Sequence, residues 1–154
     1  LDKGREAHRQ GSRLSAGAAA LEAMLEKHAL TLATSGSAPG FVNALSPTAA
    51  ELRDNGFLPS FVSTEMPFGG VMRFTIRVGA NRGLFGLACG DTSVLTMGQP
   101  GSSVAGQIMH AANGRGLRTT AALPGILSGP SFQDTPSPFN GPAIVCAWAA
   151  LPAQ

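Results

Sequence analysis

A stripe of small and apolar residues through residues 2–33 constrains the fold more than any other feature of the sequence. Successive members are three or four residues apart, which places all of them on one face of an α-helix. The members are Gly4, Ala7, Gly11, Leu14, Ala18, Leu21, Leu25, His28 and Leu32. At about 1.5 Å per residue the helix would be on the order of 48 Å long, more than a compact domain of this size requires. We therefore expect one long N-terminal helix that continues into another segment or packs on another molecule.

The side chains of this stripe change size along the helix. They are small before Leu14 and mostly bulky from Leu14 onward. The second half of the helix should therefore pack on a core, and its start should be exposed. The predicted helix packing face consists of Leu14, Ala18, Leu21, Leu25, His28 and Leu32. We interpret His28 as a residue at the edge of this face and not as a catalytic group.

Composition favours a single folded domain over residues 1–154, with a globular part at about 41–151. Charged residues make up 13% of the chain, about half the usual share, whereas 44% are apolar. The 20 glycines and 11 prolines predict many turns between short strands. The net charge is only +2 and the sequence contains no tyrosine, so a basic surface with interleaved aromatic residues is not indicated. We do not expect a nucleic-acid partner.

Several segments after the first helix have the patterns of short elements. Ser46 and Pro47 have the residue types of an N-cap and a first helical position, and Asn55-Gly56 would end that helix. Residues 71–78 alternate between apolar and polar, which is typical of a half-buried strand. A turn at 79–83 and a return strand at 84–89 would complete a β-hairpin.

The rest of the chain should supply a helix, further strands and one long loop. Ser102 or Ser103 could cap a helix that ends at Asn113-Gly114, and residues 117–123 form a possible third strand. The continuous apolar run at 143–151 predicts a central strand covered on both faces. The segment 124–142 contains five prolines and no periodicity, so we expect a long functional or mobile loop. The predicted fold class is α+β, with the long helix packed on an antiparallel sheet of about three to five strands, and short extra helices.

The sequence offers little evidence for catalysis or for metal or cofactor binding. Ser103 lies in a motif similar to a nucleophile elbow, but the only later histidine, His110, would lie about 10 Å away on the same helix. A helix-capping role for Ser103 fits better. The three histidines are scattered, and neither a phosphate-binding loop nor a dinucleotide-binding motif occurs. We therefore expect no enzyme activity, no catalytic residues, no metal site and no cofactor.

Cys89 and Cys146 are the two cysteines of the chain. Their spacing excludes a zinc motif of the usual kind and leaves either a disulfide or two buried thiols. We favour a disulfide, because each cysteine lies in a predicted strand. A disulfide would imply an oxidising compartment.

The order of these elements resembles type IVb pilins, most closely the pilin-like N-terminal region of shufflon-type minor pilins. Three segments carry the resemblance. They are residues 48–59, the sequence Met66-Pro67-Phe68-Gly69-Gly70 that leads into the strand at 71–78, and residues 104–108 before Gly114-Arg115-Gly116. The resemblance covers most of residues 14–151. It implies a type IV pilin-like fold. Pilins usually carry one disulfide in the C-terminal half, and the two cysteines of this chain match that pattern.

The resemblance also implies a function. It predicts a major or minor subunit of a type IVb pilus or related secretion pseudopilus, which assembles by helix packing and contributes to adhesion. Its partners would be other pilin subunits, the assembly machinery and a possible surface receptor. It would reside in the inner membrane and periplasm before assembly and in the extracellular pilus afterwards. In that family the first helix begins with a membrane-spanning half. No run within this chain has 18 uninterrupted apolar residues, so the resemblance implies that such a segment lies upstream of Leu1.

A second hypothesis belongs to a different class of protein. The chain could be a stand-alone exported binding module whose recognition surface is the 124–142 loop. The sequence upstream of Leu1 would discriminate between the two hypotheses. A filament subunit needs a short basic leader and about 20 apolar residues there, whereas a binding module needs an ordinary signal peptide.

Overall fold

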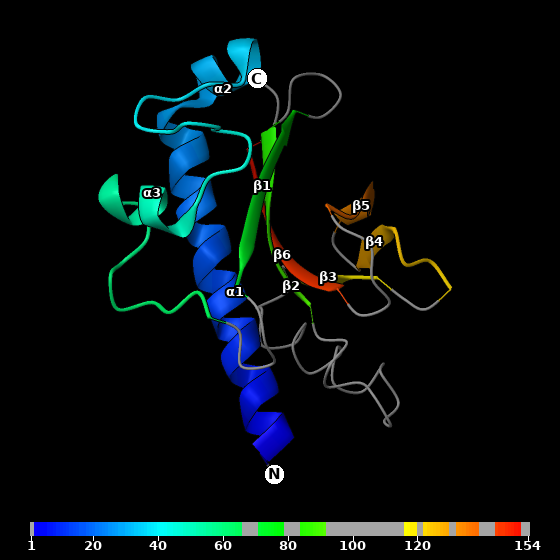
Figure 1. Cartoon of the computed structure of the whole chain (residues 1–154). Coiled ribbons are helices and arrows are strands. Elements are labelled where there is room, and N and C mark those ends of the chain that lie inside the picture. The colour runs from blue at the N-terminus through cyan, green and yellow to red at the C-terminus, as the bar shows by residue number, and fades with distance from the viewer. Residues whose placement is uncertain are drawn as a thin grey trace.

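The polar start and apolar stripe of the N-terminal segment form a helix that runs along one face of a β-sheet (Figure 1). The computed structural model describes residues 2–65, 71–78, 84–91, 116–119, 122–129, 132–138 and 144–151. The helices are α1 (Asp2–Lys27), α2 (Ala29–Ser35) and α3 (Ala49–Asp54). The strands are β1 (Arg73–Val78), β2 (Leu84–Asp91), β3 (Gly116–Arg118), β4 (Ile126–Gly129), β5 (Phe132–Pro136) and β6 (Ile144–Leu151). The α+β class predicted from the sequence is therefore confirmed.

The predicted single helix over 2–33 is divided at His28 into α1 and α2. His28 has φ −119° and ψ 26°, outside the helical region, although helical hydrogen bonds run from its N–H to Met24 and from Leu32 to its carbonyl (each 3.0 Å). Its ring lies edge-on to Phe57 with the centroids 5.9 Å apart. The helix is thus distorted at one residue whose side chain packs on a neighbouring loop. Gly36, in the left-handed conformation at φ 66°, ends α2.

All strand pairs in the sheet are antiparallel, and the strand order is β1-β2-β6-β3-β4-β5. The hairpin predicted from residues 71–89 is the β1–β2 pair, in which Phe74 lies opposite Ala88. Strand β6 is central, between β2 and β3, as its continuous apolar run predicts. The turn expected at 79–83 and the helix expected from Ser102 or Ser103 lie outside the described residues.

The sheet has six strands, so the predicted number of three to five was too low. The two additional strands, β4 and β5, occupy the segment predicted to be a loop. Neither strand shows alternation over a useful length, and the register shifts between Leu127 and Gly129. Of the third strand expected at 117–123, β3 covers Leu117 and Arg118, and Thr119 donates to the carbonyl of Ile144 on β6 (2.9 Å). Leu123 is 56% exposed.

The sheet curls so that its two edge strands meet on the side away from α1. The guanidinium of Arg77 on β1 donates to the hydroxyl of Thr135 (3.2 Å) and to the carbonyl of Pro136, both on β5. Burial lowers the pKa of Arg77, and the hydrogen bonds to Thr135 and Pro136 replace part of the water that would solvate its charged form. The concave face encloses a second core cluster formed by Leu87, Cys89, Leu117, Leu127, Ile144 and Cys146.

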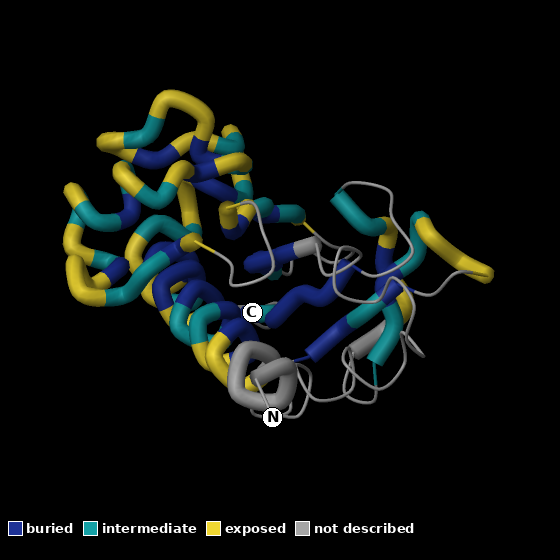
Figure 2. The backbone as a smooth tube through the Cα atoms, turned by 60° about the horizontal axis from the view of Figure 1, so that its bottom comes forward, coloured by how far each residue is buried: buried dark blue, intermediate teal, exposed yellow. Residues whose placement is uncertain are grey.

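The main core lies between the other face of the sheet and α1. Side chains alternate along the strands, so that Phe74, Ala88 and Ala147 face α1 whereas their chain neighbours face the concave side. Figure 2 shows the buried positions along the strands beside α1 and the exposed ones on the outer loops. The helix contributes Leu14, Ala18, Leu21, Met24 and Leu25, all 0% exposed.

Two glycines allow α1 to approach the sheet closely. A Cβ atom on Gly17 would lie 2.5 Å from the Met72 sulfur and 3.1 Å from the Ala88 Cβ. A Cβ atom on Gly86 of β2 would lie 3.0 Å from a methyl of Leu21. Contacts at these distances require the neighbours to shift, and the main chain beneath Ala88 is a rigid neighbour. The helix and the sheet therefore approach so closely at these two positions that neighbouring side chains fill the space a Cβ atom would need.

The burial of α1 generates a prediction with a matched control. Leu25 is 0% exposed in α1 and Leu30 is 76% exposed in α2. We expect Leu25→Ala to lower the free energy of unfolding by about 2–5 kcal/mol, because it removes buried methyl groups and leaves a cavity. The same change at Leu30 should alter it by less than about 0.5 kcal/mol. Urea titration of both variants measures the difference, and equal effects would contradict this packing.

Candidate functional site

Most residues of the helix packing face predicted from the sequence are buried in contacts within the chain itself. Leu14, Ala18, Leu21, Leu25 and Leu32 are each 0% exposed against the sheet and its neighbouring loops. His28 is half-buried at the edge of this face, next to Phe57. Partial burial, followed by the charge of Lys27, lowers the pKa of His28 below its ordinary value of 6.5. A neutral imidazole in this position is a packing group and has no acid or base partner among the described residues.

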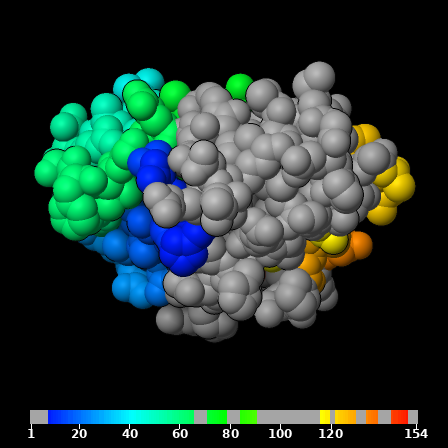
Figure 3. Space-filling model, turned by 90° about the horizontal axis from the view of Figure 1, so that it is seen from below, coloured from blue at the N-terminus to red at the C-terminus, as the bar shows by residue number. Residues whose placement is uncertain are grey.

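The beginning of α1 is less exposed than the small residues of the stripe predict. His8 and Arg9 are exposed, but Gln10 and Gly11 are buried. Neither amide atom of Gln10 has a hydrogen-bond partner among the described residues. Arg13 also donates to the carbonyl of Glu65, so α1 is tied to the segment that precedes β1. Figure 3 shows this part of α1 beside the segment that ends at residue 65.

The face of α1 that points away from the sheet carries small residues. Ser12, Ala19 and Ala23 are exposed, and Ala16 is half-buried. Their spacing of three or four residues places them in one row. Short side chains on such a row allow another helix to approach at a small interaxial distance. Among the positions of α1 whose burial is described, this row forms an exposed surface of small side chains.

Cys89 and Cys146 form a disulfide between β2 and β6. The two residues lie directly opposite each other in the strand register, with Cα atoms 4.0 Å apart, and both are 0% exposed. Of the two alternatives that the sequence leaves open, the structure contains the disulfide. It lies in the second core cluster on the concave face, where it links two adjacent central strands.

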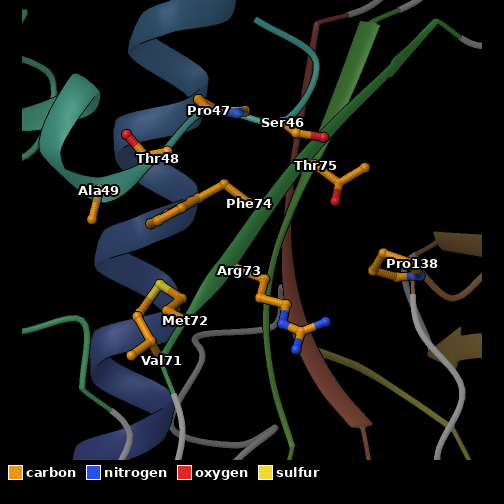
Figure 4. Close-up of a pocket in the computed structure, with 10 residues that line it drawn as sticks. All are labelled: Ser46, Pro47, Thr48, Ala49, Val71, Met72, Arg73, Phe74, Thr75 and Pro138. Carbon is orange, nitrogen blue, oxygen red and sulfur yellow. The ribbon is translucent and has the colours of Figure 1, made fainter. Parts of the chain in front are cut away.

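A cleft of about 440 Å³ opens along the edge strand β1. Its walls come from the start of α3, from β1 with the two residues before it, and from the segment after β5 (Figure 4). The lining residues are Ser46, Pro47, Thr48, Ala49, Val71, Met72, Arg73, Phe74, Thr75 and Pro138. Arg73 is the only ionisable residue among them. The sequence did not identify this cleft, because its walls come from three segments that only the fold brings together.

A capping box fixes the wall of the cleft formed by α3. The predicted N-cap, Ser46, was wrong, since Thr48 caps the helix. The Thr48 hydroxyl accepts from the N–H of Glu51, and the Glu51 carboxylate accepts from the N–H groups of Thr48 (3.1 Å) and Val42 (2.7 Å). The Thr48-x-x-Glu51 spacing is the sequence signal that identifies this cap. Main-chain donation from Val42, and then from Thr48, lowers the pKa of Glu51 below 4.5.

The structure does not test every other candidate residue. Ser103 and His110 lie outside the described residues. No group of three or more His, Cys, Asp or Glu residues in the described ranges could hold a metal ion. Asp134 is exposed on β5. Within the same ranges, no helix is long and apolar enough to cross a membrane.

Comparison with known proteins gives no relative for this chain. It matches no protein-family profile, no curated protein and no solved structure at a significant level. The function therefore has to be argued from the residues and their arrangement.

Two predictions follow from these features, and the first concerns the disulfide. Replacing both cysteines by alanine should lower the free energy of unfolding by about 4 kcal/mol in the chain-entropy model, because the sequence separation is 57 residues. The native wild-type protein should also resist alkylation without reductant, since both cysteines are 0% exposed and bonded. Denaturant titration and intact-mass measurement test both statements. Uptake of two alkyl groups by the unreduced protein would contradict them.

The second prediction concerns the pH dependence of the cap on α3. The folded-state pKa of Glu51 is depressed, so its stabilising contribution is present above 4.5 and is lost as the pH falls through the folded-state pKa. Wild type should therefore be more stable than Glu51→Gln at neutral pH, and the difference should shrink below pH 4.5. Urea titrations from neutral pH to about pH 3 measure it. A difference that stays constant over this range would show that the charge of Glu51 contributes nothing.

Proposed function

We propose that this chain is a structural subunit, major or minor, of a type IVb pilus or a related secretion pseudopilus. It acts by packing and has no catalytic activity of its own. Its partners are other pilin subunits and the assembly machinery. It resides in the inner membrane and periplasm before assembly and on the bacterial surface afterwards, where it can contribute to adhesion.

The observation that carries the proposal is the arrangement of α1 on the sheet. A 26-residue helix lies along an antiparallel sheet, with its bulky residues buried and a row of small residues facing outward. A subunit built in this way can offer the outward row to the helices of neighbouring subunits while its sheet stays folded behind it. The residue motifs that resemble type IVb pilins add to this support.

The disulfide supports the same proposal because it indicates an oxidising cellular compartment. Structural disulfides form in oxidising environments such as the bacterial periplasm. The Cys89–Cys146 bond is fully buried, so it belongs to the folded core and is not an exposed redox centre. An exported protein that has to withstand the extracellular environment gains stability from such a bond.

The alternative of a stand-alone binding module rested on the 124–142 segment as a long recognition loop. Two strands of the sheet, β4 and β5, lie in that segment, so it is not an unstructured loop. The binding-module hypothesis is retained as the outcome that follows if the pilus test fails.

The direct test uses the full-length protein in the cells that produce it. Antibodies against the 124–142 segment should label surface filaments or shed filament preparations in immunogold electron microscopy. Recovery of the full-length protein as a freely soluble periplasmic monomer, with no apolar segment upstream of Leu1, would overturn the proposal.

A pair of variants tests whether the outward row of α1 is the packing surface. Ala23→Arg places a long charged side chain on that row, whereas Ala50→Arg makes the same change at an exposed position of α3. We expect Ala23→Arg to reduce filament yield and Ala50→Arg to leave it unchanged. Both exposed changes should alter the free energy of unfolding by less than about 0.5 kcal/mol, so folding does not confound the comparison. Equal filament yields from the two variants would exclude this row as the interface.

A further inference from the structure

The outer edge of β1 is paired with other main chain at two positions and open between them. The N–H of Met72 donates to the carbonyl of Thr64, and the N–H of Ile76 donates to the carbonyl of Leu45 (each 2.8 Å). Main-chain groups of alternate residues in a strand point to the same edge, so those of Phe74 also point outward. In the described residues, no partner is recorded for the Phe74 N–H and C=O on this edge.

The gap at Phe74 arises because the antiparallel pairing between residues 64–65 and 71–72 does not continue along β1. Glu65 and Val71 form an antiparallel bridge, and Thr64 lies beside Met72. Continuing that register would bring residue 62 opposite Phe74. The chain turns away instead, because the Val62 N–H donates to the Pro59 carbonyl (3.1 Å).

Arg53 fixes the turn from its other side by donating to the Val62 carbonyl (2.9 Å). Both main-chain groups of Val62 are therefore engaged away from β1. The cleft lies where the third residue of this antiparallel ladder would otherwise pair with Phe74. Its lining includes Phe74, Pro47 and Arg73 (Figure 4).

We propose that this cleft binds an extended peptide carrying an acidic residue, which adds to β1 as a short antiparallel strand. One peptide residue would accept from the Phe74 N–H and donate to the Phe74 C=O, as in other cases of strand addition to a sheet edge. A cleft of about 440 Å³ is within the usual size range of ligand sites. The proposal does not depend on the pilus assignment, because it concerns the isolated chain.

The register also determines which peptide side chains fit. The residue opposite Phe74 points to the same side as Phe74 and should be small, because Phe74 is itself buried in the main core. The next residue toward the peptide C-terminus lies opposite Arg73, and the preceding one lies opposite Thr75. A glutamate opposite Arg73 forms a cross-strand pair of opposite charge. The guanidinium has five N–H donors, and a carboxylate can accept from two of them at once.

The test measures binding of a blocked, fluorescein-labelled tripeptide, Val-Ala-Glu, to the 154-residue chain by fluorescence anisotropy. Its residues would lie opposite Thr75, Phe74 and Arg73, between the contacts of β1 with Leu45 and Thr64. Two peptides serve as controls. N-methylation of the alanine removes the donor to Phe74, and we expect it to weaken binding by about tenfold or more. Replacement of the glutamate by glutamine should weaken binding about fivefold.

Protein variants test whether the peptide binds in the cleft. Ser46→Trp fills the cleft and should abolish binding, whereas Ser12→Trp, at an exposed position of α1, should leave it unchanged. Arg73→Gln should remove the preference for glutamate over glutamine. A purely structural role of Arg73 would instead weaken both peptides equally.

The outcomes that overturn the proposal are distinct from failure of the pilus assignment. Equal binding to wild type and Ser46→Trp places the peptide elsewhere, and no saturable binding at millimolar peptide excludes strand addition. Insensitivity to N-methylation would also exclude it. Absence of filaments from cells would leave the binding result unaffected, because the binding measurement uses the isolated chain alone.

Discussion

The close contact between α1 and the sheet is the constraint on which the rest of the structure depends. It requires small residues on both surfaces, with Gly17 and Ala18 on the helix and Gly86 and Ala88 on β2. A Cβ atom at Gly17 would lie 2.5 Å from the Met72 sulfur and one at Gly86 would lie 3.0 Å from a methyl of Leu21, so these neighbours would have to shift. Such shifts would disturb the core around Leu14, Leu21 and Leu25, each fully buried. Dispersion and hydrophobic burial across this interface therefore depend on residues that contribute almost no side-chain area themselves.

The opposite face of the sheet is stabilised by a different set of interactions. It curls until β1 and β5 approach, where Arg77 donates to Thr135 and Pro136. Within the curl, the disulfide and its apolar neighbours form the second core. One face is thus held by helix packing, and the other by covalent linkage and edge-to-edge hydrogen bonding. This division explains why β6 is apolar on both sides, since both cores include residues of β6 as well as of its neighbour β2.

The sequence predicted the features that have a clear period or a continuous apolar run. The stripe of α1, the alternation in β1 and the uninterrupted run of β6 correspond to observed elements. The strands β4 and β5 were missed, because each is only four or five residues long and is specified by its neighbours in the sheet. Short strands of this kind leave no local pattern from which they could be recognised.

The sequence was least informative about the candidate site. The break at His28 occurs where its ring lies edge-on to Phe57, a contact that helix periodicity does not encode. The burial of Gln10, which is not a member of the stripe, was equally unexpected. The cap at Thr48 was predictable from its Glu51 partner, but Ser46-Pro47 gave a competing signal. The cleft along β1 could not be predicted, because it arises where a ladder ends at a turn between Pro59 and Val62.

The two proposed interfaces use different parts of the molecule, which makes them compatible. The outward row lies on α1, whereas the cleft runs along the edge strand β1, between the start of α3 and Pro138. An open sheet edge is ordinarily a liability, because it can pair with any exposed strand. Here the contacts with Leu45 and Thr64 flank the open part of β1 at Phe74. A segment that pairs there must be short and must fit between these two contacts, and its side chain beside Arg73 must suit a positive charge. The structure thus limits unspecific strand pairing at the same edge where it leaves room for a specific peptide.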